Sequence, residues 1–141
     1  MKAGIDYIGL GVGVFIFNEK DELLLMKRGA KSKNEVGAWS VPGGTVDFGE
    51  TLKQTAIREV KEELDVAIEI LEQLPAYEVL LPEESQHWVT NIFKAKIIGG
   101  VPKIQEPEKC EALEWFSLNA LPSPIAKASF PAVAYFQNRR K

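Results

Sequence analysis

The sequence predicts an α/β domain in which several strands surround one strongly patterned helix. Short runs of apolar, β-favouring residues, separated by turn residues, recur along most of the chain. Residues 51–64 instead carry apolar side chains at helical spacing. The chain has 141 residues, which suits a single domain, 1–141, that buries roughly two thirds of its unfolded surface in one core.

The first expected elements are two strands joined by a polar turn. Residues 11–17 form an apolar run, residues 18–21 are polar, and residues 23–27 are predicted to return as the hairpin partner. The polar, glycine-containing segment 29–38 is interpreted as a mobile loop suited to substrate contacts. Residues 39–41 are expected to form a short strand.

The central helix has a start signal and one apolar face. Thr51 and Gln54 match a capping box, in which each side chain bonds the backbone of the other. The face expected to pack on the sheet consists of Ala56, Ile57, Val60 and Leu64. The opposite side carries glutamates.

The second half of the chain predicts further strands and a terminal helix. Strands are expected at residues 66–74, 76–81, 87–98 and 111–116. Residues 103–109 are polar and are interpreted as a loop that brings glutamates toward a site. A helix is expected at 126–138, interrupted near Pro131 and followed by basic residues at 139–141.

The glycine run at residues 9–13 is not interpreted as a dinucleotide-binding motif. Such a motif opens a helix, whereas a turn and a second strand follow here. We interpret these glycines as small residues in a strand that a ligand or another strand approaches closely.

Glu59, Glu62 and Glu63 form the strongest candidate site. On a helix, residues three and four apart are neighbours, so the three carboxylates lie within about 100° of one another. Like charges so placed repel by roughly 0.2–0.5 kcal/mol, and a divalent cation such as Mg²⁺ would offset that cost. The alternative is a solvated face on which Arg58 and Lys61 pair with these glutamates. The glycine-rich turn before the helix, where backbone can approach a ligand, favours the metal site.

Residues 44–66, GTVDFGETLKQTAIREVKEELDV, resemble the Nudix hydrolase signature GX5EX7REUXEEXGU, in which U is a bulky aliphatic residue. The matching positions are Gly44, Glu50, Arg58, Glu59, Val60, Glu62, Glu63 and Val66. Asp65 stands where the family has its second glycine, and aspartate tolerates the left-handed conformation that a helix C-terminus often needs. The resemblance implies the Nudix fold, an α/β/α sandwich with a mixed central sheet.

The resemblance also implies a reaction and its site. Nudix enzymes hydrolyse a nucleoside diphosphate linked to another group, through attack of water on a phosphorus of the pyrophosphate with Mg²⁺, or Mn²⁺ in its place. The implied metal ligands are Glu59, Glu62, Glu63 and the backbone carbonyl of Gly43, with Gly44 beside it at the substrate. Arg58 is expected to orient a carboxylate, Glu50 or Glu62, by a bidentate bond.

Relatives often add a glutamate from a distant loop as a ligand or base, and Glu111 is favoured here over Glu108. Arg28 matches a position where relatives hold a basic side chain against phosphate, with a surface arginine as the alternative. His87, the sole histidine, is a candidate base or substrate contact, with a structural role as the alternative.

The tryptophans are expected mainly in the core or on a sheet face. Of Trp39, Trp88 and Trp115, only Trp39 is a candidate to stack on a base, because it lies beside the glycine-rich turn.

Residues 87–90, 106–111 and 114–115 resemble nucleoside triphosphate diphosphatases, including enzymes that act on oxidised or modified purine triphosphates and on dihydroneopterin triphosphate. This implies release of a nucleoside monophosphate and pyrophosphate, although residues 122–136 depart from that branch. The alternative enzyme is an ADP-ribose or dinucleoside polyphosphate pyrophosphatase. The alternative of another class is a regulatory Nudix module that binds a nucleotide without turnover, and the retained carboxylates argue against it.

Composition limits the partners. The net charge of −3 and the pI near 5.3 argue against nucleic acid as a partner. The small-molecule nucleotide expected as the partner is what the resemblance implies. Cys110 is the single cysteine and is expected to be inert packing. With neither a signal peptide nor an 18-residue apolar run in the sequence, we expect a cytoplasmic enzyme without a membrane partner. A homodimer is left open.

Overall fold

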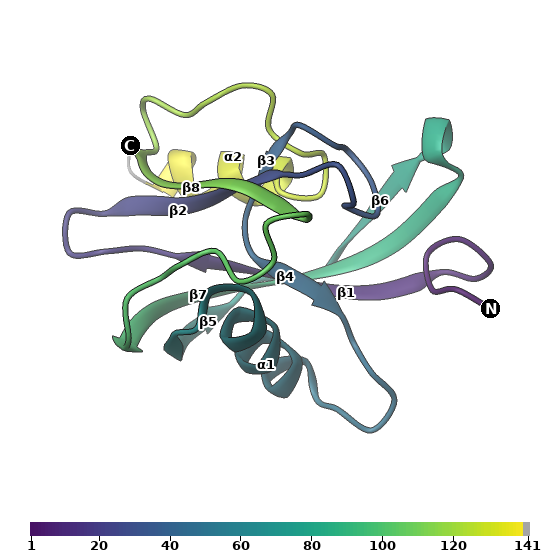
Figure 1. Cartoon of the computed structure of the whole chain (residues 1–141), viewed down its shortest axis with the longest axis horizontal. Helices are drawn as coiled ribbons and strands as arrows, with labels where there is room; N and C mark the ends of the chain where they lie inside the picture. Colours follow the sequence, from purple (N-terminus) through teal and green to yellow (C-terminus); the bar gives the residue numbers. More distant parts are fainter. Residues whose placement is uncertain (140–141) are drawn as a thin grey trace.

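The computed structural model describes residues 1–139, which form two β-sheets with helices α1 and α2 on opposite sides (Figure 1). In chain order the elements are β1 (Gly9–Ile16), β2 (Glu22–Arg28), β3 (Trp39–Ser40), β4 (Gly43–Thr45), α1 (Leu52–Leu64), β5 (Ala67–Gln73), β6 (Tyr77–Leu81), the 3-10 helix η1 (Pro82–Glu84), β7 (Gln86–Gly99), β8 (Cys110–Ser117) and α2 (Phe130–Arg139). Among the described residues, no helix has the length and apolar character needed to cross a membrane.

The larger sheet is mixed, as expected. Its strands follow the order β4-β1-β7-β5, and β6 also pairs with β7. The β1–β7 pair is parallel and the other pairs are antiparallel. Because β7 is 14 residues long, it pairs with β6 near its start and with β5 near its end.

The predicted hairpin between the first two strands is wrong in its pairing. The polar turn forms, with Asn18 Oδ1 accepting from the backbone N–H of Lys20 (3.0 Å) and Glu22 (2.9 Å). Beyond an isolated bridge between Phe17 and Leu23, however, β2 leaves β1 and pairs with β3 and β8 in a second sheet. Both strands are apolar on both faces, so their sequences lack the alternation that would indicate a shared solvent-exposed sheet.

The core has two halves separated by β1. Val12, Val14 and Ile16 pack on the α1 side, whereas Phe15 and Phe17 pack on the α2 side. The helical members of the two cores are Ala56, Val60 and Leu64 from α1, and Ala132, Val133 and Phe136 from α2. A strand buried on both faces between two helices gives the α/β/α sandwich that was predicted.

Helix α1 begins and ends as the sequence predicts. The Thr51–Gln54 capping box is present, and Asp65 caps the C-terminus in the left-handed conformation with a φ of 56°. The expected apolar face is wrong at Ile57, which is 46% exposed, while Thr55 is fully buried in its place. Burial of Thr55 is tolerated because its hydroxyl donates to Glu50 Oε1 at 2.9 Å.

The remaining expected strands form within one or two residues of their predicted bounds. Strand β4 was not expected, because its residues were interpreted as part of the glycine-rich turn before the helix. Helix α2 starts at Phe130, so Pro131 lies in its first turn, where a missing N–H costs little, and does not interrupt a longer helix. Arg139 ends this helix, and residues 140 and 141 of the predicted basic end lie outside the described residues.

Candidate active site

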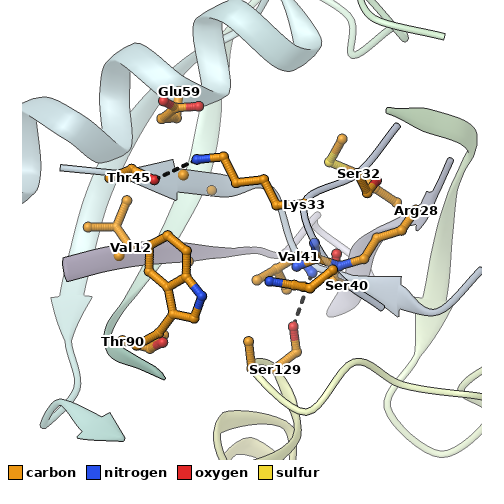
Figure 2. Close-up of a pocket in the computed structure, with 18 of the residues that line it drawn as sticks. Val12, Arg28, Ser32, Lys33, Ser40, Val41, Thr45, Glu59, Thr90 and Ser129 are labelled. Carbon is orange, nitrogen blue, oxygen red and sulfur yellow. Dashed lines mark hydrogen bonds between the residues drawn. The ribbon is translucent and has the colours of Figure 1, made fainter. Parts of the chain in front are cut away.

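A cavity of about 400 Å³ lies between α1, β1, β4 and the loop 29–38 (Figure 2). Two groups of side chains line this cavity. The carboxylate wall consists of Glu59, Glu62 and Glu63 from α1 together with Glu106. The aromatic wall consists of Val79 and Leu81 from β6 and Trp88 from β7, which also pack as one apolar cluster. The cavity therefore combines acidic groups with an aromatic ring.

Arg58 organises the outer side of the carboxylate wall. Its Nε donates to Glu50 Oε2 at 2.7 Å and its Nη2 to Glu50 Oε1 at 2.9 Å, which confirms the expected bidentate bond. These bonds hold the pKa of Glu50 at about 2. Arg58 Nη1 also donates to Glu59 Oε1 at 2.8 Å and lies 3.3 Å from Glu62 Oε2. Arg58 thus positions carboxylates and stays outside the cavity lining.

Glu63 is the innermost carboxylate. Its Oε1 accepts a hydrogen bond from the backbone N–H of Gly43 at 3.0 Å. Burial, and then the neighbouring charge of Glu59, raise the pKa of Glu63 to about 8. Burial raises the pKa of Glu59 as well. Two partly desolvated carboxylates side by side are unfavourable without a nearby positive charge.

The donor chemistry of this wall fits a divalent cation. Hard cations such as Mg²⁺ bind carboxylate oxygens, and Glu63 and Glu59 meet at the cavity beside the glycine backbone. A Cβ atom at Gly44 would lie 2.3 Å from the Glu59 carboxyl carbon, so any larger residue there would displace this carboxylate. Across residues 1–139, no three histidine, cysteine or acidic groups converge as a ready-made metal site. Arg58 contributes to that arrangement because it binds Glu59 and Glu62 from the side.

Arg28, at the end of β2, lines the cavity as the sequence suggested. Its Nε is buried and has no hydrogen-bond partner within the described chain. Burial lowers the pKa of its guanidinium group, opposed by the charges of Glu35, Glu63 and Glu84. A guanidinium group with an unsatisfied N–H at a cavity is suited to binding phosphate oxygens.

The structure does not bring the favoured loop glutamate to the cavity. Glu111 is exposed on β8 and pairs with Lys27 at 3.3 Å, and its rival Glu108 pairs with Lys31 at 3.4 Å. Side chains alternate along a strand, and because Cys110 points into the core, Glu111 points away from it.

Glu106 is the loop glutamate that lines the cavity, where its charge contributes to the raised pKa of Glu63. It is exposed and pairs with Lys109, which also lines the cavity, at 3.3 Å. The loop that carries it folds back over the end of α1, as expected, because the backbone N–H of Gln105 donates to the carbonyl of Glu63 at 3.2 Å. The sequence offered several glutamates in one loop and no signal that separated Glu106 from the others.

Trp39 and His87 also lie outside this cavity, whose aromatic residue is Trp88. Trp39 packs edge-on against Phe116, with ring centroids 5.1 Å apart, in the core on the α2 side. His87 bonds Glu78 at 2.9 Å. Since neighbouring residues of a strand face opposite ways, His87 turns outward where Trp88 turns inward.

The glycines near the N-terminus make room for Trp88. A Cβ atom at Gly9 would lie 2.4 Å from the Trp88 ring, and one at Gly4 would lie 2.3 Å from it. A Cβ atom at Gly43 would lie 2.0 Å from the carbonyl oxygen of Val12 on the neighbouring strand. The contact at Gly9 confirms that the glycine run allows close approach, here by a side chain, whereas the close approach of β4 to β1 depends on Gly43.

Comparisons with known proteins identify relatives of this arrangement. The NUDIX domain family model matches residues 8–136. The human 8-oxo-dGDP phosphatase NUDT18 is 30% identical over 128 residues, which is 89% of this chain and 36% of that protein. The chain therefore spans about a third of that relative's length. An ADP-ribose pyrophosphatase of Methanocaldococcus jannaschii is 32% identical over 82% of this chain and 67% of its own length. The crystal structure of a MutT NUDIX hydrolase from Burkholderia pseudomallei has a TM-score of 0.84 and 34% identity, with 92% of this chain and 98% of that chain covered.

Proposed function

Because this chain belongs to the Nudix hydrolase family, we propose that it hydrolyses a pyrophosphate bond of a nucleoside triphosphate and releases a nucleoside monophosphate and pyrophosphate. The proposed cofactor is Mg²⁺, with Mn²⁺ as a substitute. The observation that carries the proposal is a cavity that joins partly buried carboxylates, a guanidinium group whose Nε has no partner among the described residues, and an aromatic ring. These are the groups needed for a metal ion, a phosphate chain and a base.

The chain's own residues have distinct parts in this reaction. Glu59, Glu62 and Glu63 would hold the cation, which, when bound, lowers the pKa of water and neutralises charge on the departing phosphate. Arg28 binds phosphate oxygens. Glu106, across from Glu63, accepts the proton of the attacking water as the new phosphorus–oxygen bond forms and the bridging bond breaks.

An oxidised or otherwise modified purine nucleotide is the proposed substrate class. The name of the human relative, an 8-oxo-dGDP phosphatase, supports a purine base that carries such a modification. The cavity volume of about 400 Å³ lies within the range of about 300–1,000 Å³ found for small-molecule sites. Its aromatic wall supplies a surface on which a purine ring can stack.

A second candidate is ADP-ribose hydrolysis. The archaeal relative is named as an ADP-ribose pyrophosphatase and matches over two thirds of its own length. The same carboxylate wall would act on a pyrophosphate placed between two sugars. The two candidates differ only in what lies beyond the pyrophosphate, so substrate comparison separates them.

The test is turnover of a nucleotide panel with and without Mg²⁺, with products separated by chromatography. The panel contains 8-oxo-dGTP, 8-oxo-dGDP, dGTP, dihydroneopterin triphosphate, a dinucleoside polyphosphate and ADP-ribose. We expect a triphosphate to yield its monophosphate, and we expect Glu63→Gln to lower the rate by about 10³-fold or more, since amide oxygens bind cations weakly.

The matched control is Glu69→Gln, which changes an exposed glutamate on β5 that pairs with Lys96 at 3.4 Å. It should retain the wild-type rate. Consumption of ADP-ribose alone would establish the second candidate. Nucleotide binding without turnover of any compound would instead support a regulatory module, and Glu63→Gln within tenfold of wild type would contradict the metal site.

A further inference from the structure

Lys33 reaches across the cavity from the loop 29–38. Its Nζ donates to Thr45 Oγ1 at 2.9 Å and lies over the Trp88 ring, 5.6 Å from the ring centroid. Figure 2 shows its side chain extended from the loop toward Thr45, with Glu59 beyond it. The positive charge of Lys33 also interacts with the negative charge of Glu59. The ammonium group of Lys33 therefore contacts the aromatic wall and also interacts electrostatically with the carboxylate wall.

The backbone of Lys33 is anchored, so its side chain is the part free to move. Gln86 Nε2 donates to the Lys33 carbonyl at 2.8 Å. Gln86 Oε1 accepts from Trp88 Nε1 at 2.8 Å and from Asn34 Nδ2 at 2.8 Å. Since indole N–H can only donate, the orientation of the Gln86 amide is determined, and the loop is fastened beside the ring.

The same network leaves one group unsatisfied. Asn34 Oδ1 is buried and has no hydrogen-bond partner in the part of the chain that the structure describes. A buried acceptor without a partner is unfavourable. Because Asn34 also lines the cavity, this acceptor lies where an entering ligand can satisfy it while the loop backbone stays in place.

Trp88 is the natural platform for a base, but its ring is covered here. The residue is 9% exposed, the backbones of Gly4 and Gly9 pack directly against ring atoms, and Lys33 lies over the ring. Glycine backbone cannot move away without disturbing β1, whereas a lysine side chain rotates freely. A base that stacks on Trp88 therefore has to displace Lys33.

We propose that Lys33 is a positioning residue that couples cation binding to base binding, covering Trp88 in the cation-free protein and moving to the substrate phosphates once a divalent cation occupies the carboxylate wall. This inference rests on the proposed function. A dication at Glu59 and Glu63 repels the ammonium group and removes the negative charge that attracted it. The Lys33 ammonium group then binds the anionic phosphates, and the base stacks on the uncovered Trp88 ring.

The test follows Trp88 directly by ¹⁹F NMR of protein labelled with 5-fluorotryptophan. Three signals are expected, and the Trp88 signal is assigned by its loss in Trp88→Phe. Mg²⁺ is titrated into the wild type, into Lys33→Ala and into the control Lys31→Ala, which removes an exposed lysine two residues away that pairs with Glu108. Guanosine, which has no phosphate to contact the cation, is then titrated with and without Mg²⁺.

We expect Mg²⁺ to shift the Trp88 signal in the wild type and in Lys31→Ala, and to leave it in place in Lys33→Ala. Guanosine should bind the wild type several-fold more tightly with Mg²⁺ than without it, and Lys33→Ala equally under both conditions. An equal Mg²⁺ effect in wild type and Lys33→Ala, or a Trp88 signal that guanosine never moves, would overturn the inference.

Calorimetry of Mg²⁺ binding to the same samples separates the proposed function from the coupling through Lys33. If no cation binds, the proposed metal-dependent function and the coupling fail together. If the cation binds and nucleotides turn over while Trp88 is unaffected, only the coupling fails.

Discussion

The two walls of the cavity differ in where their contacts come from. Most of the carboxylate wall lies on one continuous stretch, residues 44–66, in which a capped helix follows a glycine-rich strand after a short loop. The aromatic wall comes from the β6–β7 hairpin, but the segments that meet it are distant in sequence: Gly9 packs against Trp88, and Asn34 reaches Gln86 across 52 positions. Chemistry carried by one stretch can be predicted from its local spacing. A surface that depends on distant neighbours is defined only after folding.

The restraints on the two walls differ accordingly. The carboxylate wall is fixed by bonds within and next to one stretch: Arg58 bonds Glu50 from the same stretch, and Gly43 on β4 bonds Glu63 near the C-terminal end of α1. The aromatic wall depends on Gln86, whose amide links Trp88 to the loop 29–38. We therefore expect substitutions at the carboxylate wall to affect turnover and those at the aromatic wall to affect affinity.

The largest effect is expected at Glu106, which belongs to the carboxylate wall but lies outside residues 44–66. We expect Glu106→Gln to lower kcat by about 10²-fold, since a general base is lost, with little change in folding stability. Rates at saturating Mg²⁺ provide the measurement, with thermal melting to check that the variant folds.

Glu111→Gln is the matched comparison, because Glu111 lies on β8, directly after the loop that carries Glu106, and pairs with Lys27 outside the cavity. It should keep kcat within about twofold of wild type, as expected for an exposed ion pair. The reverse result, a crippled Glu111→Gln beside an active Glu106→Gln, would restore the role that the sequence alone assigned to Glu111.

The presence of Glu106 at the cavity, where the sequence favoured Glu111, shows the limit of prediction from sequence. The helix, its caps, the Arg58–Glu50 bond and the mixed sheet could be predicted, because each depends on local spacing or on a motif without gaps. The choice among Glu106, Glu108 and Glu111 depends on how a loop docks against the end of α1, which no local pattern encodes.

The same limit explains the exchange of one tryptophan for another. Trp39 is close to the glycine-rich turn in sequence, yet β3 pairs with β2 and carries Trp39 into the core on the α2 side. Trp88 is distant in sequence, yet the parallel pairing of β7 with β1 sets it opposite Gly9 at the cavity. The pairing of β1 and β2 was mistaken for the same reason, since strands buried on both faces do not reveal their partners.

A smaller effect is expected at the aromatic wall. Trp88→Leu should raise KM for a nucleotide substrate about tenfold, the loss expected when one base loses its stacking surface, while kcat falls much less. Steady-state kinetics with the preferred compound of the panel measure both constants.

Trp39→Leu serves as the control, because it also removes a tryptophan from a packed position. Both variants should melt at lower temperature than the wild type, but Trp39→Leu should retain its KM. Equal increases in KM would mean that lost packing, and not lost stacking, weakens substrate binding. The two walls would then differ less than their construction suggests.

The smallest effect is expected at the start of α1, where Thr51 Oγ1 accepts from the Gln54 backbone N–H at 3.1 Å. Thr51→Ala should cost about 1 kcal/mol of unfolding free energy, or roughly 3 °C in Tm for a domain of this size, because one N–H at the helix start loses its partner. Thr51→Ser keeps the hydroxyl group and should retain most of the stability. Since Arg58, Glu50 and Gly43 hold the carboxylates independently of the cap, kcat should stay near the wild-type value in both variants. A loss of kcat in Thr51→Ala larger than its loss of stability would mean that the helix start itself sets the geometry of the carboxylate wall, and that this wall is less rigid than its short-range bonds indicate.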